Sequence, residues 1–183
     1  MNKILLHSCC APCSSAILEW LRLNNYATTV FFYNPNIYPE TEYTIRKREI
    51  VRYAAEIGVP IVDFDDSDWS AEHEKWRGEL CHLADEPERG SRCLECFKIR
   101  LLKTAEYAAE HSFDAFTTTL ASSRWKDLNQ IMEAGRYAAS QYPSTTFWEK
   151  NWRKGGLYER RNILAKQFYN QTYCGCEYSI RNK

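Results

Sequence analysis

Short apolar runs alternate along the chain with longer amphipathic segments. The runs with the length and residue types of strands are 4–6, 28–33, 60–64, 113–119 and 144–148. The segments with apolar residues at helical spacing are 16–24, 41–57, 65–77, 91–110 and 126–140. Alternation of strands and helices predicts a parallel sheet joined by right-handed crossovers. We therefore expect one three-layer α/β domain, residues 1–183, built on a five-stranded parallel sheet.

Polar residues indicate where two of these helices begin. Ser14 or Ser15 stands directly before the apolar positions of the first helix, and Asp66 or Ser67 precedes those of the third. Side-chain oxygens of such residues accept hydrogen bonds from the free N–H groups of a first helical turn. We therefore expect these residues to cap the two helices.

Composition narrows the class of protein without identifying a partner. Of the 183 residues, 44% are hydrophobic and 26% are charged, which is typical of a globular protein. The formal net charge of zero gives no overall field that would attract nucleic acid. The apolar runs are too short to span a bilayer, and residues 1–3 are not followed by the long apolar region of a signal peptide. We expect a cytoplasmic protein, without membrane contact, whose thiols stay reduced.

Seven of the eight cysteines fall into three short groups. The groups are Cys9, Cys10 and Cys13, then Cys93 and Cys96, then Cys174 and Cys176. The first group follows the 4–6 strand, and the end of such a strand is the usual place for a ligand in an α/β sheet. Cys93 and Cys96 are predicted in the first turn of a helix, where free N–H groups lower the pKa of a thiol. We expect the three groups to meet at the C-terminal edge of the sheet.

Clustered thiols in a reducing compartment favour metal or redox chemistry over structural disulfides. Two Cys-x-x-Cys pairs have the spacing of zinc ligands, so a closed structural zinc site is one alternative. Seven thiols exceed the four that such a site uses, and a chain of this length does not need a metal to fold. The residues therefore favour an iron–sulfur cluster, with the other thiols binding a second metal ion or forming a redox disulfide. Cys81 is interpreted as an isolated buried or surface thiol.

Other residues have weaker claims to a role. His7 at a strand end is interpreted as a hydrogen-bonded core residue, and Asp127 is a weak candidate for an oxygen ligand. The segment 150–166 carries six Lys and Arg residues against the single acid Glu159, which favours contact with RNA phosphates. The aromatic residues that flank the loop after the second strand, and that could stack on a base, are Tyr33, Tyr38 and Tyr43.

Five motifs together resemble those of the QueH family of epoxyqueuosine reductases. They cover nearly the whole chain in the family's order, and they are HSCCAPCSS at 7–15, FYNPNI at 32–37, RCLECF at 92–97, FTTTL at 116–120 and QTYCGC at 171–176. The resemblance implies a fold similar to adenine-nucleotide α-hydrolase-like domains, with the cysteine loop in place of a glycine-rich phosphate loop. The sequence departs from the family at Asn151, where an acidic residue is expected.

The same resemblance implies an activity and a cofactor. Members of the family reduce epoxyqueuosine in the anticodon loop of tRNA to queuosine, without cobalamin. They are described as carrying a [4Fe-4S] cluster with a neighbouring iron ion. The resemblance thus implies a reductive deoxygenation, in which the epoxide oxygen leaves as water and electrons come from a donor that the sequence does not identify. The alternative from another class is a zinc-stabilised RNA-binding module without redox activity.

Rigidity of the backbone predicts a division of labour among the seven thiols. Four lie on a strand-to-helix loop or a helix start, and we expect these to hold the cluster: Cys10, Cys13, Cys93 and Cys96. Three are expected to form a catalytic centre with a second metal beside it: Cys9, Cys174 and Cys176. Gly175 allows an unusual turn between the last two, and we expect that segment to move more easily than the loop.

Overall fold

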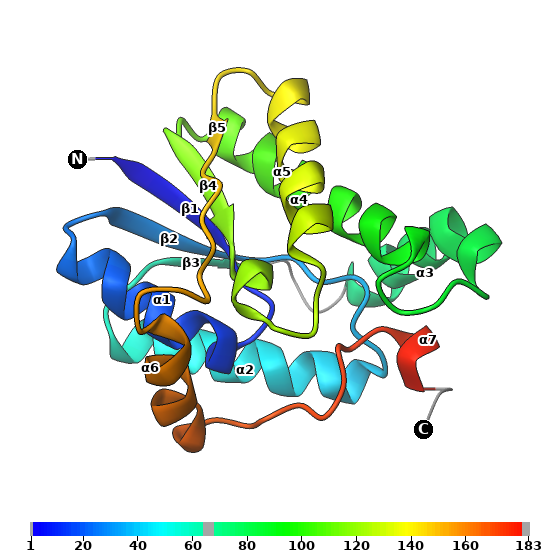
Figure 1. Cartoon of the computed structure of the whole chain (residues 1–183), viewed down its shortest axis with the longest axis horizontal. Helices are drawn as coiled ribbons and strands as arrows, with labels where there is room; N and C mark the ends of the chain where they lie inside the picture. Colours follow the sequence, from blue (N-terminus) through cyan, green and yellow to red (C-terminus); the bar gives the residue numbers. More distant parts are fainter. Residues whose placement is uncertain (1, 64–67, 181–183) are drawn as a thin grey trace.

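Five strands form one sheet in which every pair of neighbours is parallel. The computed structural model describes residues 2–63 and 68–180 (Figure 1). The strands, in the sheet order β3-β2-β1-β4-β5, are β3 (Ile61–Asp63), β2 (Ala27–Phe32), β1 (Lys3–His7), β4 (Ala115–Thr118) and β5 (Thr146–Phe147). The predicted five-stranded parallel sheet is confirmed.

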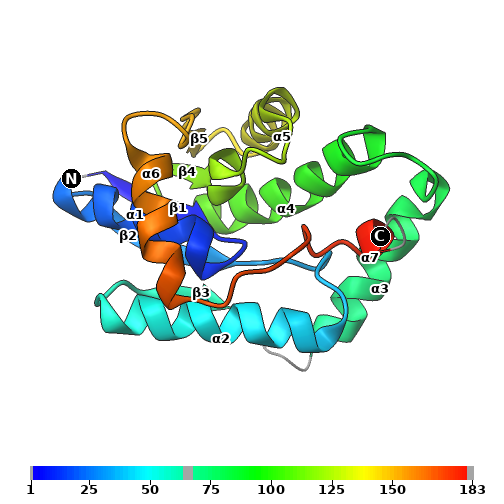
Figure 2. The same ribbon diagram turned by 60° about the horizontal axis from the view of Figure 1, so that its bottom comes forward.

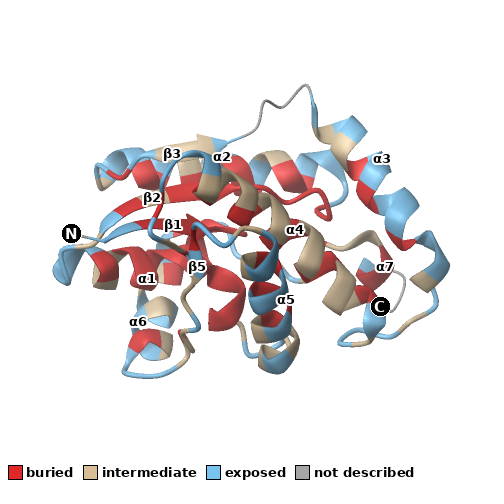
Figure 3. Ribbon diagram, turned by 90° about the horizontal axis from the view of Figure 1, so that it is seen from above, coloured by how far each residue is buried: buried red, intermediate tan, exposed pale blue. Residues whose placement is uncertain are grey.

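Helices cover both faces of this sheet. They are α1 (Ala11–Leu23), α2 (Glu40–Glu56), α3 (Trp69–Leu80), α4 (Ser91–Glu110), α5 (Leu128–Gln141), α6 (Leu157–Leu164) and α7 (Glu177–Ile180). Short 3₁₀ turns lie at Cys81–Leu83, Thr119–Ser122 and Ala165–Gln167. In Figure 2, α1, α2 and α6 lie on one side of the sheet and α4 and α5 on the other. This arrangement confirms the three layers, and the burial colouring of Figure 3 shows buried central strands between half-exposed helices.

The order of the strands reverses at β1. The chain moves outward from β1 to β2 and β3, and then returns to β4 on the other side of β1. Right-handed crossovers therefore place α1 and α2 on one face and α4 and α5 on the other. The helices diverge at the C-terminal ends of β1 and β4, which is where open α/β sheets bind ligands. The cysteine loop follows β1 directly.

The first helix begins earlier than the serine pattern predicts. It starts at Ala11, directly after the extended Cys10, and Pro12 lies in its first turn. Proline is well suited to a first turn because its fixed φ is helical and its missing N–H has no helical partner to lose. Ser14 and Ser15 therefore lie inside the helix and not at its cap, and Cys13 belongs to the first turn. The expected cap of the third helix at Asp66 or Ser67 lies outside the described residues.

The last third of the chain is less regular than the rest. The predicted strand 144–148 shortens to the two residues of β5, and only 157–164 of the basic segment is an α-helix. After the 3₁₀ turn at Ala165–Gln167, the chain runs without regular structure between α2 and α4 to reach α7, as the red segment of Figure 2 shows. No helix in the described part of the chain combines the length and apolar character needed to cross a bilayer.

Candidate thiol site at the edge of the sheet

One cavity, about 430 Å³ in volume, brings the three cysteine groups together. The cysteines that line it are Cys9, Cys13, Cys93, Cys96, Cys174 and Cys176. They come from the start of α1, the start of α4 and the segment before α7. About 80 residues of sequence separate each of these three places from the next. The predicted meeting of the three groups is therefore confirmed. Cys81 lies elsewhere as an exposed thiol.

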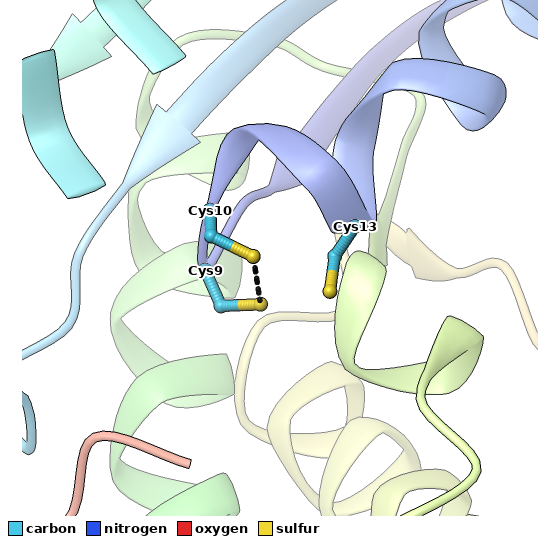
Figure 4. Close-up of side chains that lie close together, drawn as sticks. All are labelled: Cys9, Cys10 and Cys13. Carbon is cyan, nitrogen blue, oxygen red and sulfur yellow. Dashed lines mark hydrogen bonds between the residues drawn. The ribbon is translucent and has the colours of Figure 1, made fainter. Parts of the chain in front are cut away.

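The thiols of the first group lie closest to one another. The Sγ atoms of Cys9, Cys10 and Cys13 all fall within 4.8 Å of each other, and those of Cys9 and Cys10 are 3.7 Å apart (Figure 4). Two thiolates bound to one tetrahedral metal ion with metal–sulfur bonds of about 2.3 Å are separated by about 3.8 Å. All three residues are buried. The group therefore has the spacing and the donor atoms of a metal site.

Hydrogen bonds to the sheet fix the backbone of this loop. The amide of Cys9 donates to Thr119 Oγ1 at 3.2 Å, just after β4. Asn34 Nδ2 donates to the Ser8 carbonyl at 2.9 Å from the end of β2. Ser14 Oγ donates to the Cys10 carbonyl at 2.7 Å, and it lies 2.6 Å from the Ser8 hydroxyl. Neighbouring strands on both sides of β1 thus position the thiols.

His7 supports the loop from below and is not a ligand. Its Nε2 donates to the Tyr33 carbonyl at 3.1 Å, so its Nδ1 accepts from the Thr118 hydroxyl at 2.8 Å. Burial, together with the nearby Arg100 guanidinium, lowers the pKa of His7 to about 3. The imidazole is therefore neutral and both nitrogens are occupied, which confirms the interpretation of His7 as a core residue.

The segment that carries Cys174 and Cys176 is tied to α2 and to the loop after β2. Arg46 is 2% exposed, and its guanidinium donates to the Cys174 carbonyl at 3.1 Å and to the Tyr173 carbonyl at 3.2 Å. Cys176 forms an antiparallel bridge with Ile37. Gly175 has φ of +103°, and a Cβ there would come within 3.0 Å of Arg46 Nη1. Position 175 therefore requires glycine, both because its φ is positive and because it lies so close to Arg46.

The second pair begins α4, as predicted, but its pKa shift has the opposite sign. Cys93 accepts a hydrogen bond from the Arg89 amide at 3.3 Å, and Cys96 is buried. Burial is the largest influence on both thiols and raises the pKa of Cys93 and of Cys96. The prediction that the helix start lowers the pKa is therefore wrong, because loss of solvent outweighs the N–H groups.

The other two groups each contain one thiol with a lowered pKa. Hydrogen bonds from Cys10 and Cys13 lower the pKa of Cys9, and one from Cys176 lowers that of Cys174. The Lys126 ammonium contributes to both shifts. The pKa of Cys10 is raised in return by its bonds to Cys13 and Cys9. Without metal, each group thus concentrates its negative charge on one sulfur.

Cations outnumber carboxylates along the cavity. The charged residues that line it are Arg46, Arg89, Arg92, Arg100, Lys126 and Arg161, against Glu88 and Asp127. Asp127 also caps α5, since its Oδ1 accepts from the Asn129 amide at 2.8 Å. Such a wall stabilises thiolates and attracts anions.

The basic segment 150–166 divides its charges among separate roles. Arg160 forms a two-bonded ion pair with Glu19, at 2.7 and 2.6 Å. Arg161 lines the cavity, with its Nη2 at 4.0 Å from Cys13 Sγ. Lys150 Nζ lies 3.1 Å from the ring centroid of Trp20. The segment is therefore not a uniform solvated face, and its contact with RNA stays a prediction.

The tyrosines chosen from sequence are poorly placed to stack on a base. Tyr33 and Tyr43 are buried, and the hydroxyl of Tyr33 donates to Glu72 at 2.6 Å. Tyr38 is 41% exposed but stacks on His73. Trp125, which sequence reasoning passed over, lines the cavity and is 82% exposed. The sequence feature that could have identified Trp125 is an aromatic residue between two cations, Arg124 and Lys126, after the end of a strand.

Comparison with known proteins gives the family. The sequence model of the family described as Epoxyqueuosine reductase QueH matches residues 4–182. A protein of that name from Histophilus somni is 46% identical over 183 residues, which cover 99% of this chain and 73% of that protein. Like-named proteins from Acinetobacter baylyi and Thermotoga maritima are 44% and 33% identical, covering 99% and 98% of this chain and 82% and 91% of their own lengths. The resemblance of the sequence motifs is thereby confirmed, and the chain belongs to the QueH family of epoxyqueuosine reductases.

Proposed function

We propose that this chain, acting as one iron–sulfur domain over residues 1–183, reduces epoxyqueuosine in the anticodon loop of tRNA to queuosine without cobalamin. The observation that carries the proposal is the convergence of six grouped cysteines on one cavity in a member of the QueH family. The reaction consumes two electrons and two protons, breaks both C–O bonds of the epoxide and releases its oxygen as water. An external reductant supplies the electrons.

The residues fit a thiolate-bound metal group. The donor atoms at the cavity are sulfurs, the Cys9, Cys10 and Cys13 group is buried, and its spacing suits metal binding. Seven thiols are more than a closed four-ligand zinc site needs. A [4Fe-4S] cluster, when bound, supplies single electrons, and an additional iron ion supplies Lewis acidity towards the epoxide oxygen.

Cys10, Cys13, Cys93 and Cys96 are proposed to hold the cluster, with Cys9, Cys174 and Cys176 around the reacting group. Cys9 and Cys174 are the two thiols whose pKa is lowered with help from Lys126, which supports their pairing. The Sγ atom of Cys9 also lies within 4.8 Å of those of Cys10 and Cys13, which places it beside two of the proposed cluster ligands.

The cations of the wall have a separate task. Lys126 and Arg100 both stabilise the charge of the Cys9 thiolate, and Arg46 is close enough to Cys9 and Cys10 to have its own pKa raised by them. Metal binding releases protons from thiols, and neighbouring positive charge makes that release easier. These residues thus favour loss of the Cys9 proton when metal binds.

Anaerobic reconstitution with iron and sulfide, followed by assay on tRNA that carries epoxyqueuosine, tests the proposal. We expect several irons and acid-labile sulfides per chain, broad visible absorption, and conversion of the epoxide with a chemical reductant and no added cobalamin. Apoprotein treated with zinc instead of iron is the matched control and should give no product. Stoichiometric zinc with no sulfide after anaerobic purification, and a colourless protein, would support the zinc-stabilised RNA-binding module instead.

A further inference from the structure

Trp125 is the most exposed large apolar side chain in the described part of the molecule, and it stands at the mouth of the thiol cavity. It is 82% exposed, and among the exposed large apolar residues of the described ranges it alone lines the cavity. Scattered surface hydrophobes are ordinary in proteins. An indole at the rim of a cation-lined cavity is different, because most of its surface is accessible to a ligand and charged residues lie beside it.

The loop that carries Trp125 is held in place by arginines. Arg89 Nε donates to the Trp125 carbonyl at 3.0 Å, and its Nη2 donates to the Arg124 carbonyl at 3.5 Å. Arg153 Nη2 donates to the Lys126 carbonyl at 2.8 Å. Three consecutive carbonyls are thus fixed by two guanidinium groups. The backbone below the indole is pre-organised, so little ordering is lost when a ligand stacks on it.

The cationic side chains of this loop and of its two supporting arginines are not neutralised by direct contact with any carboxylate that the structure describes. Within residues 2–63 and 68–180, none of Arg89, Arg124, Lys126 and Arg153 forms an ion pair. Burial and then the repulsion of Arg89 lower the pKa of Arg153, with a further contribution from Arg124 and partial relief from Asp127. Arg124 lies flat on Tyr158, with its Cζ 3.5 Å from the ring centroid. Such a cluster is suited to a phosphate.

We infer that this rim, defined as Trp125 with Arg89, Arg124 and Arg153, binds single-stranded RNA beside the nucleotide that enters the cavity. Trp125 stacks on the base next to that nucleotide, and the arginines contact the phosphate between them. Aromatic stacking combined with backbone cations is how proteins bind unpaired nucleotides, and the bases of a tRNA anticodon loop are unpaired. The inference rests on the proposed function for the identity of the RNA.

Binding of a fluorescently labelled anticodon stem-loop RNA to the reconstituted full chain tests the stacking. Trp125→Ala should weaken the affinity roughly fivefold to 150-fold, which is the range for losing one base–aromatic stack. Trp125→Phe keeps an aromatic face and should lose less. Leu23→Ala is the matched control, because Leu23 is 78% exposed at the far end of α1. Circular dichroism shows that each variant is folded.

An abasic RNA identifies the partner of the indole. The base on one side of the substrate nucleotide is removed in one RNA, and the base on the other side in a second. On one of these RNAs the penalty of Trp125→Ala should disappear, since the stack is already absent. An equal penalty on the intact RNA and on both abasic RNAs, or no penalty on any of them, overturns the assignment.

The salt dependence of the same binding tests the arginines. Arg124→Gln should reduce the slope of log affinity against log salt by about 0.7, the value for one phosphate contact on a single strand. Arg22→Gln, an exposed arginine at the end of α1, should leave the slope unchanged. An unchanged slope for Arg124→Gln overturns the phosphate contact.

Binding and turnover separate this inference from the proposed function. If the wild-type chain reduces epoxyqueuosine in tRNA while Trp125→Ala binds RNA like wild type, the rim assignment is wrong and the function stands. If Trp125→Ala and the abasic RNAs behave as expected while the reconstituted wild-type chain yields no queuosine, the rim stands and the reductase proposal is wrong.

Discussion

The loop after β1 and the segment before α7 present the same chemistry on two different supports. Each contains one thiol with a lowered pKa, Cys9 in the loop and Cys174 in the segment, and Lys126 contributes to both. The loop is fixed by the strands on either side of β1 and opens directly into a helix. The segment 171–176 is held by the buried Arg46, by the bridge between Ile37 and Cys176 with its neighbouring bond from the Tyr38 amide to the Gly175 carbonyl, and by a bond from Gln171 to Cys10.

This difference matches the proposed division between thiols that hold the cluster and thiols that surround the reacting group. A loop built into the centre of the sheet is positioned by the core and changes only if the fold changes. A segment anchored by a few long-range contacts can be disturbed alone. The two regions can therefore be tested independently, and the following variants are arranged from the largest expected effect to the smallest.

Cysteine variants should divide the two regions most strongly. Cys13→Ala and Cys96→Ala are expected to lose most of the bound iron and sulfide, because they remove proposed ligands on rigid helix starts. Cys176→Ala should keep much of the cluster and lose turnover. Iron, sulfide and single-turnover reduction measured on all three variants make the comparison, with Cys81→Ala as a control at an exposed thiol. If Cys176→Ala loses iron as completely as Cys96→Ala, the segment is itself a cluster support.

The sequence predicted the loop better than it predicted the segment. Strands at 4–6 and 113–119 could be recognised from local composition, and parallel strands bring their C-terminal ends to one edge of a sheet. That rule predicts that Cys9 lies close to the residues that follow β4. The start of α1 was missed because Pro12 outweighs the serines as a helix signal, and that error is confined to one turn.

Long-range side-chain contacts were beyond sequence reasoning. Nothing local to Arg46 indicates that its guanidinium binds carbonyls more than 120 residues away. The count of charges in 150–166 predicted that Arg160 contacts RNA, whereas its guanidinium forms an ion pair with the distant carboxylate of Glu19. The pKa of Cys96 likewise depends on its burial, in a cluster that includes Trp76 and Tyr178 from other elements. In each case the deciding partner is distant in the chain.

Replacing the buried arginine should release the segment alone. Arg46→Met is expected to lower the free energy of unfolding by about 3 kcal/mol, because the buried Glu42 loses its ion pair and two carbonyls lose donors. In metal-free protein, alkylation of Cys174 should accelerate, whereas that of Cys9 should not, because Cys9 loses only a nearby positive charge that favours its thiolate. Urea denaturation and mass spectrometry measure the two effects. Arg52→Met on the same helix, at an exposed ion pair, is the control and should cost less than about 1 kcal/mol. Equal acceleration at Cys9 and Cys174 would show that both regions share one anchor.

Adding a single methyl group should disturb the segment by a smaller amount. Gly175 and Gly155 both have positive φ, at +103° and +68°, but only Gly175 is crowded, by Arg46 and Ile37. Gly155→Ala should cost about 1 kcal/mol of stability, which is the price of left-handed backbone without glycine. Gly175→Ala should cost about 1–2 kcal/mol more, because its φ lies beyond the left-handed region that alanine can adopt and the tied Arg46 side chain resists displacement. Equal losses of unfolding free energy in the two variants would contradict the anchoring role of Arg46.

The smallest effect concerns the bond that joins the two regions. Gln171 Nε2, at the start of the segment, donates to Cys10 Sγ in the loop at 3.1 Å, while its Oε1 is buried without a hydrogen-bond partner. Gln171→Met removes a donor worth about 1 kcal/mol together with an acceptor that is costly to bury, so unfolding of the apoprotein should change by less than about 1 kcal/mol. Iron retention should respond more, because a hydrogen bond that orients a ligand typically changes metal affinity about tenfold. Competition with an iron chelator measures it, and Gln141→Met at the exposed end of α5 is the control. If Gln171→Met retains iron like that control, the loop holds its metal without help from the segment.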